Sequence, residues 1–195
     1  MSENKRQIQK RETRNKLIEI AAEIFSKNGI LSTKTIDIAN AAKVSHGTVF
    51  SHFPTQEALI IEVINTVGTK IAARLHELVG KNKTLEQVLQ CHLDALSEFE
   101  DFYEKLILER RRLPLEARNT YISINSMISH HISLAAEKEI SDGTLRPIPI
   151  HLLYNTWIGL IHYYLTNSDL FSSDQSVLKT YGTQLLNHYI KLIKV

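Results

Sequence analysis

Cysteine, glycine and proline are scarce in this sequence of 195 residues. Cys91 is the single cysteine, which excludes an intramolecular disulfide and any cluster of cysteines around zinc or an iron–sulfur centre. We therefore expect Cys91 to be a small buried residue. Seven glycines and four prolines allow few turns, so the elements between them must be long, and long elements favour helices over strands.

Long hydrophobic runs are absent as well. The longest apolar stretch near the C-terminus, Trp157 to Leu165, is interrupted by Gly159 and His162, and no segment approaches the roughly 18 apolar residues of a membrane span. The N-terminus is polar where a signal peptide would have an apolar core. We expect no membrane partner and a cytoplasmic location.

The motifs of common enzyme classes are missing too. No glycine-rich phosphate loop, nucleophile elbow or paired-carboxylate arrangement is recognisable. The adjacent histidines His130 and His131 would point about 100° apart on a helix, and neither has a partner at the spacing of a zinc-binding HExxH motif. We expect no catalytic residue, no bound metal and no cofactor, and hence no enzyme.

Charge is present but unevenly distributed. The net charge is +2, yet residues 1–60 hold 9 Lys/Arg against 6 Asp/Glu while the remainder holds 14 against 15. The first 16 residues alone carry six bases and two acids. An exposed basic arm points weakly to a phosphate-bearing partner, because such arms also serve as solubilising tails.

The spacing of apolar residues predicts an all-α fold. Leu17, Ala21 and Phe25 lie on one face of a helix expected at about residues 13 to 27, which ends at Asn28-Gly29. Two short helices and a helix restart follow, with Thr35, Ser45 and Thr55 as the expected N-caps. Longer helices are expected at about residues 58–79, 84–98, 101–112, 115–140, 150–167 and 174–194.

Residues 35 to 53 meet the packing requirements of a helix-turn-helix. Small and apolar side chains fall where two short crossing helices would touch: Ile38, Ala39, Val44, Val49 and Phe53. The opposite face is short, polar or aromatic and suits a DNA major groove: Ser45, His46, Thr48, Phe50, Ser51 and His52, with Gly47 allowing close backbone approach. The alternative is a plain helical hairpin in an all-helical protein.

The run from Ser45 to Leu59, SHGTVFSHFPTQEAL, resembles the signature of TetR-type (tetracycline-repressor-like) regulators. Residues 18–29 and 35–39 resemble the family's first two helices, so the similarity spans about residues 10 to 62. It implies an all-α homodimeric transcription factor, usually a repressor. Its expected parts are a basic N-terminal arm (1–11), a three-helix DNA-binding head (12–62) and a larger ligand-binding and dimerisation domain (63–195).

The resemblance also implies which residues meet DNA. They lie on and around the second helix of the motif: Lys34, Thr35, Lys43, Ser45, His46, Gly47, Thr48, Phe50, Ser51, His52 and Thr55. Thr35 would cap its helix and touch backbone phosphate, and Thr55 would bind phosphate from the next helix start. The family often has Gly, Tyr and Lys where Lys43, Phe50 and Gln56 stand. Phosphate binding is therefore expected to depend more on Lys34, Lys43 and the N-terminal arm.

The C-terminal domain offers candidates for a ligand cavity on several helices: Phe99, Phe102, Tyr103, Asn125, Trp157 and His162. Ordinary packing is the alternative for each of them, because aromatic residues at helical spacing are usually core. The run Glu109-Arg110-Arg111-Arg112 is interpreted as a solvated helix end, where the dipole favours cations.

The last two expected helices carry more apolar surface than one domain needs, which predicts a four-helix dimer interface. The expected contact residues are Ile158, Ile161, Leu165, Leu178, Leu185, Leu186 and Ile190. The sequence thus predicts a repressor released from a pseudo-palindromic double-stranded DNA operator by a small-molecule effector. An activator, a regulator without an effector and, least favoured, a helical enzyme are the alternatives.

Overall fold

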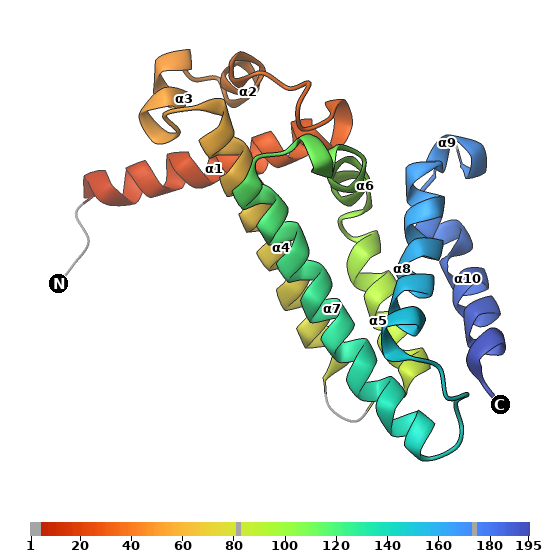
Figure 1. Ribbon diagram of the computed structural model, residues 1–195. Coiled ribbons are helices and arrows are strands. Elements are labelled where there is room, and N and C mark those ends of the chain that lie inside the picture. The colour runs from red at the N-terminus through yellow and green to blue at the C-terminus, as the bar shows by residue number, and fades with distance from the viewer. Residues whose placement is uncertain (1–4, 81–82, 173–174) are drawn as a thin grey trace.

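The computed structural model describes residues 5–80, 83–172 and 175–195, and no strand occurs among them. Its N-terminal part, called the head below, consists of α1 (Lys5–Asn28), α2 (Thr35–Ala42) and α3 (His46–His52). The long helix α4 (Gln56–Val79) leads from the head into the rest of the chain. In Figure 1 the head lies across the top of the molecule and α4 descends from it.

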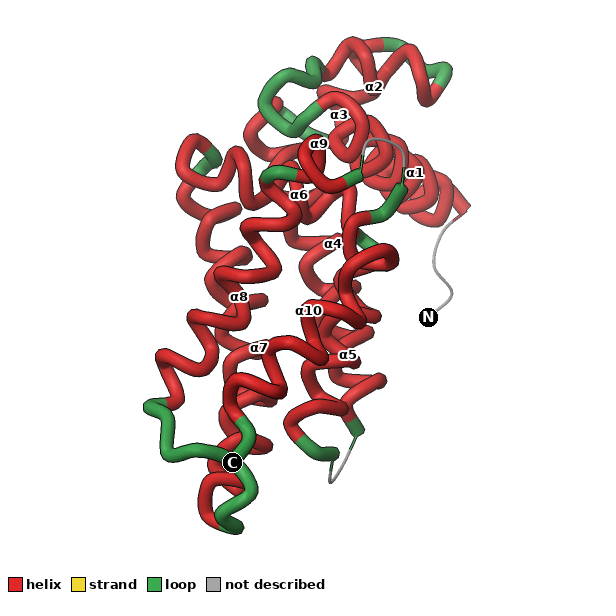
Figure 2. Tube along the Cα trace, turned by 90° about the vertical axis from the view of Figure 1, so that its right-hand side faces the viewer, coloured by secondary structure: helices red, strands yellow, loops and turns green. Residues whose placement is uncertain are grey.

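The C-terminal domain is a bundle of helices that run mostly along α4. It comprises α5 (Leu85–Ser97), α6 (Glu100–Glu109) with a following 3-10 turn η1 (Arg110–Arg112), α7 (Leu115–Ser141), α8 (Ile150–Thr166), α9 (Ser168–Phe171) and α10 (Val177–Ile193). Figures 1 and 2 show α8 and α10 side by side at the end of the bundle away from α4. The all-α fold and the order of helices are as predicted.

Two boundaries differ from the sequence-based expectation. The first helix begins at Lys5 and not near residue 13, so the described part of the basic N-terminal segment forms the first turns of α1. Ile8 is the one apolar residue of residues 5–12, and a single apolar residue gives no periodicity from which a helix could be predicted. The short helix α9 was not expected, and α10 begins at Val177 where a start at residue 174, outside the described residues, was expected.

A close approach of α4 and α7 holds the middle of the bundle together. Gly68 of α4 is buried, and a Cβ at this position would lie 2.8 Å from Ile124 Cδ1 and 3.1 Å from Thr120 Cγ2 of α7. A larger residue at this position would require the Ile124 and Thr120 side chains to shift. The buried apolar residues of the head and of the C-terminal domain form one continuous core, to which α4 contributes a buried face along its length.

The residues predicted for the dimer interface are wrong, because most of them face the interior of the single chain. Six of the seven are buried within the chain itself: Ile161, Leu165, Leu178, Leu185, Leu186 and Ile190. Ile158 alone is half-buried. Apolar spacing marks the buried face of a helix but does not say whether the same chain or a second copy covers that face. The residues selected by this spacing therefore lie on the inward faces of the two helices.

Two further expectations concern the single cysteine and membrane-spanning helices. Cys91 is buried as predicted, with its thiol donating to the Leu78 carbonyl over 3.3 Å. Among the described residues, none of the helices is long and apolar enough to cross a membrane.

Candidate DNA-binding site

The helix-turn-helix forms because its two short helices share a small apolar contact. Ile38, Ala39, Val49 and Phe53 are buried, and Val44 packs against them, as the spacing predicted. Between the helices Lys43 adopts the left-handed conformation (φ 57°, ψ 44°). An L-residue there costs roughly 1–2 kcal/mol relative to the right-handed form, whereas glycine would adopt this conformation without that cost.

Side-chain caps fix where α3 and α4 begin. Ser45 Oγ accepts from the backbone N–H of Thr48 (3.1 Å) and Thr55 Oγ1 accepts from that of Ala58 (3.0 Å), so both predicted caps are confirmed. The prediction for Thr35 is wrong. Lys34 occupies the N-cap of α2 and its N–H donates to Asp37 Oδ2 over 2.9 Å.

The Thr35 side chain has a different role, because it joins the two helices of the motif. Thr35 Oγ1 lies 2.8 Å from His46 Nε2, and Thr35 is buried. The hydroxyl therefore orients the imidazole at the first residue of α3. In this geometry Thr35 acts on the recognition surface through His46.

The outward face of α3 is open to solvent. Ser45, His46, Gly47, Phe50 and Ser51 are exposed, with 41% of Phe50 accessible. The His46 and Phe50 rings meet edge to face, with centroids 4.7 Å apart. Ser51 Oγ donates to the Thr48 carbonyl over 2.7 Å. This surface combines short polar groups with one aromatic edge, the kind of face that fits base edges in a major groove.

Gly47 stands out on this face because the protein alone does not need it. It lies in the first turn of α3, it is exposed, and the nearest atom to a Cβ built on it would be Ser45 Oγ at 3.8 Å. Glycine within a helix costs roughly 0.5–1 kcal/mol relative to alanine. A partner that approaches the backbone closely would account for it.

Basic residues flank the helix-turn-helix. Lys34 and Lys43 are exposed beside α2 and α3. Arg14 of α1 binds Glu62 of α4 over 2.9 Å, and its guanidinium lies 5.0 Å from the centre of the Phe53 ring. Sequence reasoning missed this role of Arg14, since its partners are 39 and 48 positions away in the chain.

His52 and Gln56 complete the predicted surface. His52 is half-buried, and burial first, then the nearby charges of Lys10 and Arg14, lowers its pKa. Gln56 Nε2 donates to the Thr33 carbonyl over 3.0 Å. Gln56 thus connects the start of α4 with the segment before α2.

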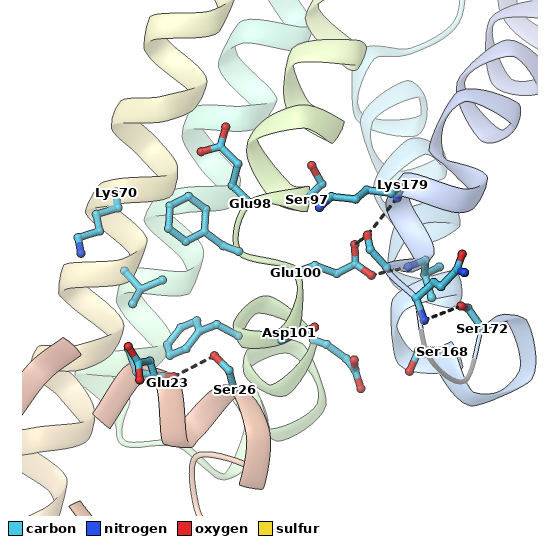
Figure 3. A pocket seen from close by; sticks show the side chains of 18 of the residues that line it. Glu23, Ser26, Lys70, Ser97, Glu98, Glu100, Asp101, Ser168, Ser172 and Lys179 are labelled. Carbon is cyan, nitrogen blue, oxygen red and sulfur yellow. Dashed lines mark hydrogen bonds between the residues drawn. The ribbon is translucent and has the colours of Figure 1, made fainter. Parts of the chain in front are cut away.

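The residues predicted to line a ligand cavity fall into two separate places. Phe99 and Phe102 line an open cleft of about 700 Å³ between α1, α4, α6 and the start of α10 (Figure 3). Most charged groups on its walls are acidic: Glu19, Glu23, Glu98, Glu100, Asp101 and Glu104, against Lys70 and Lys179. Such a cleft disfavours an anionic molecule.

The other four candidates, Tyr103, Asn125, Trp157 and His162, belong to a polar cluster inside the C-terminal domain. Tyr103 Oη lies 3.1 Å from His162 Nε2, and the Tyr154 hydroxyl donates to Asn125 Oδ1 over 2.9 Å. Trp157 is fully buried, and its Nε1–H donates to His92 Nδ1 over 3.0 Å. We call this set the interior cluster: His92, Tyr103, Tyr121, Asn125, Tyr154, Trp157 and His162.

Burial keeps the histidines of the interior cluster neutral. Desolvation, with a smaller effect of His162, lowers the pKa of His92 to about 3. Desolvation and the Arg110 charge lower the pKa of His162 to about 4. The buried Nε2 of His92 has no hydrogen-bond partner, and an unsatisfied buried polar atom costs about 1–3 kcal/mol. Sequence reasoning missed His92 as a member of this cluster, because its partner Trp157 lies 65 positions away in the chain.

Among the described residues, no group of three or more His, Cys, Asp or Glu side chains is placed so that it could hold a metal ion. His76 of α4 and His131 of α7 have ring centroids 5.8 Å apart, and their neighbour His130 lies 5.9 Å from His131.

Comparison with known proteins adds to this geometry. The model of the family "Bacterial regulatory proteins, tetR family" matches residues 17–63. The transcriptional repressor KstR2 of Mycobacterium tuberculosis is 24% identical over 161 residues, covering 77% of this chain and 80% of KstR2.

Solved structures are similar over nearly the whole length and show the same fold. The structure of the ketosteroid transcriptional regulator KstR2 of M. tuberculosis gives a TM-score of 0.73 at 19% identity, covering 93% of this chain and 95% of that one. The transcriptional regulator FadR of Bacillus subtilis in complex with stearoyl-CoA gives a TM-score of 0.71 at 19% identity, with 90% and 96% covered.

Proposed function

We propose that this chain is a DNA-binding transcriptional regulator of the TetR type and that it acts as a homodimeric repressor, a proposal supported by the family match over residues 17–63 and by the similarity to KstR2. It binds a pseudo-palindromic operator and is released by a small, largely apolar effector held in the C-terminal domain. The exposed face of α3 supports DNA binding, because it lies on a packed helix-turn-helix and is flanked by the exposed residues Lys34 and Lys43. Since its target is chromosomal DNA, the protein acts in the cytoplasm.

The residue roles in this proposal follow from exposure. His46, Gly47, Thr48, Phe50 and Ser51 face base edges and the adjoining backbone. Lys34, Lys43 and the basic first turns of α1 neutralise phosphates. Thr55 and His52 adjoin the same surface at the start of α4. One recognition helix of seven residues buries too little surface for tight specificity, which is why two heads are required.

A mobility-shift titration with DNA flanking the protein's own gene tests DNA binding. We expect a salt-sensitive complex whose affinity falls selectively for the operator in Thr48→Ala. Removal of residues 1–11 should weaken binding to all sequences and flatten the salt dependence. Ser123→Ala, an exposed change on α7 of the C-terminal domain, is the control. Absence of any complex at low salt would refute the proposal.

The dimer in this proposal is formed by the outward faces of α8 and α10. On α8 this face includes Leu152 and Tyr163, which are 49% and 56% exposed, with Gly159 between them. On α10 it includes Leu192, 54% exposed. Packing against a second copy would remove this apolar surface from water, and it would place two heads on one DNA duplex.

The proposed effector site is the interior cluster. Its hydroxyl, amide and imidazole groups are buried or half-buried, and burial keeps both imidazoles neutral. The unpartnered Nε2 of His92 offers one further hydrogen bond. These groups suit an apolar molecule with one or two uncharged polar groups, in the manner of a ketosteroid, the class named for the KstR2 neighbour. The acidic cleft beside the cluster on α6 disfavours a polyanion such as the stearoyl-CoA bound by FadR.

Thermal-shift measurements with a ketosteroid panel, a hydrophobic amine panel and stearoyl-CoA test the effector. We expect a neutral or cationic compound to raise the melting temperature, and we expect Tyr103→Phe to reduce that rise. The same compound must weaken operator binding, since coupling between two sites is reciprocal. Stabilisation by stearoyl-CoA alone, or stabilisation with unchanged DNA affinity, would contradict this part of the proposal.

A further inference from the structure

The turn after α1 binds a carboxylate from a distant part of the sequence. Glu109, the last residue of α6, accepts from the backbone N–H of Ile30 through Oε1 (3.0 Å) and from that of Leu31 through Oε2 (2.7 Å). The two partners lie 79 and 78 positions away in the sequence. Two adjacent N–H groups that converge on one carboxylate form a charge-assisted pair, which is about twice as strong as a neutral one.

Gly29 shows that the turn is shaped around this carboxylate. Its φ is +93°, a conformation that L side chains rarely adopt. In addition, a Cβ on Gly29 would lie 2.7 Å from Glu109 Oε1. Glycine therefore both turns the chain at the end of α1 and leaves the space that the carboxylate occupies.

The same turn leads directly to the recognition helix. Ile30 is fully buried, and the Thr33 carbonyl accepts from Gln56 Nε2 at the start of α4. Thr35 then contacts His46, the first residue of α3, over 2.8 Å. An uninterrupted series of contacts connects Glu109 with the DNA-facing surface.

The residue after Glu109 reaches in the other direction. The Arg110 guanidinium donates to the Tyr121 hydroxyl over 3.1 Å and lies 5.4 Å from the centre of that ring. The Tyr121 ring stacks on Tyr103 with centroids 6.5 Å apart, and Tyr103 pairs with His162. Neighbouring residues at the α6–η1 junction thus contact the head and the interior cluster. The expectation that residues 109–112 form a merely solvated helix end is wrong for these two.

The opposite end of α6 is attached just as firmly. The Glu100 carboxylate accepts from the backbone N–H groups of Val177 (2.6 Å) and Leu178 (3.2 Å), and from the Ser176 hydroxyl, at the start of α10. Figure 3 shows Glu100 directed at this helix start. A ten-residue helix about 15 Å long therefore has a carboxylate contact at each end, one to α10 and one to the head.

We propose that Glu109 is a positioning residue for DNA binding: its carboxylate sets the orientation of the head on the C-terminal domain, and Arg110 makes that orientation depend on the state of the interior cluster. An effector that displaces Tyr121 would move Arg110, and Glu109 would move with it. This inference rests on the proposed function for its biological meaning, but the contact itself can be tested without an effector.

The first test separates the loss of the Glu109 hydrogen bonds from the loss of its negative charge. Glu109→Gln keeps the shape of the side chain but can accept only one of the two N–H groups, and Glu109→Ala accepts neither. We expect operator affinity to fall at least tenfold in Glu109→Ala and less in Glu109→Gln. Asp101→Asn, an exposed carboxylate on the same helix, is the charge-matched control. Loss of a negative charge by itself favours DNA binding, so weaker binding in Glu109→Gln cannot be an effect of net charge.

The second test measures the head directly. Spin labels at Asn40→Cys on α2 and Ser123→Cys on α7, both exposed, report the distance between head and C-terminal domain in a Cys91→Ala background. Labelled protein is mixed with an excess of unlabelled protein so that only pairs within one chain contribute. We expect a narrow distance distribution for the parent and a broad one for Glu109→Ala. Gly29→Ala should broaden it as well, because its Cβ displaces the carboxylate without changing any charge.

The outcomes are distinguishable from one another. Parental DNA affinity and an unchanged distance distribution in Glu109→Ala would overturn the role of Glu109. Tyr121→Phe removes the acceptor of Arg110 and should also broaden the distribution, and an unchanged one would overturn the connection to the interior cluster. If the parent protein binds no DNA, the proposed function fails, while the distance measurement still decides whether Glu109 orients the head.

Discussion

Replacing Gly47 with alanine should make the protein more stable and a poorer DNA binder. The free protein has room for the new methyl group, because the nearest atom to its Cβ is Ser45 Oγ at 3.8 Å, an ordinary van der Waals distance. No positive φ opposes the change, since positive φ among glycines is confined to Gly29, Gly80 and Gly143 in the described chain. The fold therefore gives no reason for a glycine at this position.

The size of the stabilisation follows from helix propensity. Alanine is favoured over glycine by about 0.5–1 kcal/mol in a helix interior, and Gly47 is the second residue of the seven-residue α3. For a chain of this length about 1 kcal/mol corresponds to a rise of roughly 2–4 °C in melting temperature. Differential scanning calorimetry or urea unfolding measures the gain.

The loss of DNA affinity comes from close approach. N-terminal residues of a recognition helix contact base edges and phosphates, and a methyl group on the exposed face of α3 would push the helix away from them. We expect operator affinity to fall tenfold or more, about 1.4 kcal/mol, while weak binding to unrelated DNA changes less. Ser123→Ala, a helix-favouring change on the exposed part of α7, should stabilise the protein without affecting DNA binding.

Two results would refute this reasoning. A destabilised Gly47→Ala variant would mean that the protein itself needs the glycine. A stabilised variant with full operator affinity would mean that this face of α3 does not approach DNA closely.

Three further predictions concern the turn, the interior cluster and the dimer. Lys43→Gly should relieve the left-handed strain at φ 57° and raise the free energy of unfolding by up to about 1 kcal/mol. It should also lower the slope of log DNA affinity against log salt concentration by about one. An unchanged slope in anisotropy titrations would show that Lys43 does not contact a phosphate. The folded state lowers the pKa of His92 from 6.5 to about 3 and that of His162 to about 4, so the stability that each neutral imidazole contributes is complete above pH 7 and is lost as pH falls, by about 2 kcal/mol for His92 at pH 5. Urea unfolding at both pH values should show a loss from both histidines, and His92→Gln should reduce that loss by about half while leaving the part that belongs to His162. A side chain at Gly159 on α8 would meet open space in the single chain, so Gly159→Arg should leave the helical signal intact but shift the sedimentation coefficient to that of a monomer. The control Ser123→Arg should leave the dimer intact. A Gly159→Arg protein that remains a dimer would show that this face of α8 is not the dimer interface.

The local features of this fold are predictable from the sequence because they depend on neighbouring residues. The caps at Ser45 and Thr55 and the burial of Ile38 and Val49 follow from short-range spacing. The α2 cap was assigned one residue too late because Lys34 is an unusual N-cap, and Thr35 beside it has the preferred side chain.

Other features depend on contacts that the sequence pattern does not contain. The Glu109 contact to Ile30 and Leu31 joins residues about 80 positions apart, and no local signal distinguishes such a carboxylate from a solvated one. The apolar stripe of α10 reports that Leu185 and Leu186 are buried but not whether this chain or a second copy covers them. Within the candidate ligand site, Phe102 and Tyr103 are adjacent, yet the helix directs Phe102 to the cleft and Tyr103 to the interior cluster.

A footprint on the DNA flanking the protein's own gene tests the central claim most directly. A dimer with two recognition helices must protect two half-sites related by two-fold symmetry, with centres about one helical turn, roughly 34 Å, or a multiple of it apart. We predict this pair of protected segments for the parent protein and their joint loss in Gly159→Arg. A single protected segment, or uniform weak protection without sequence preference, would contradict the account.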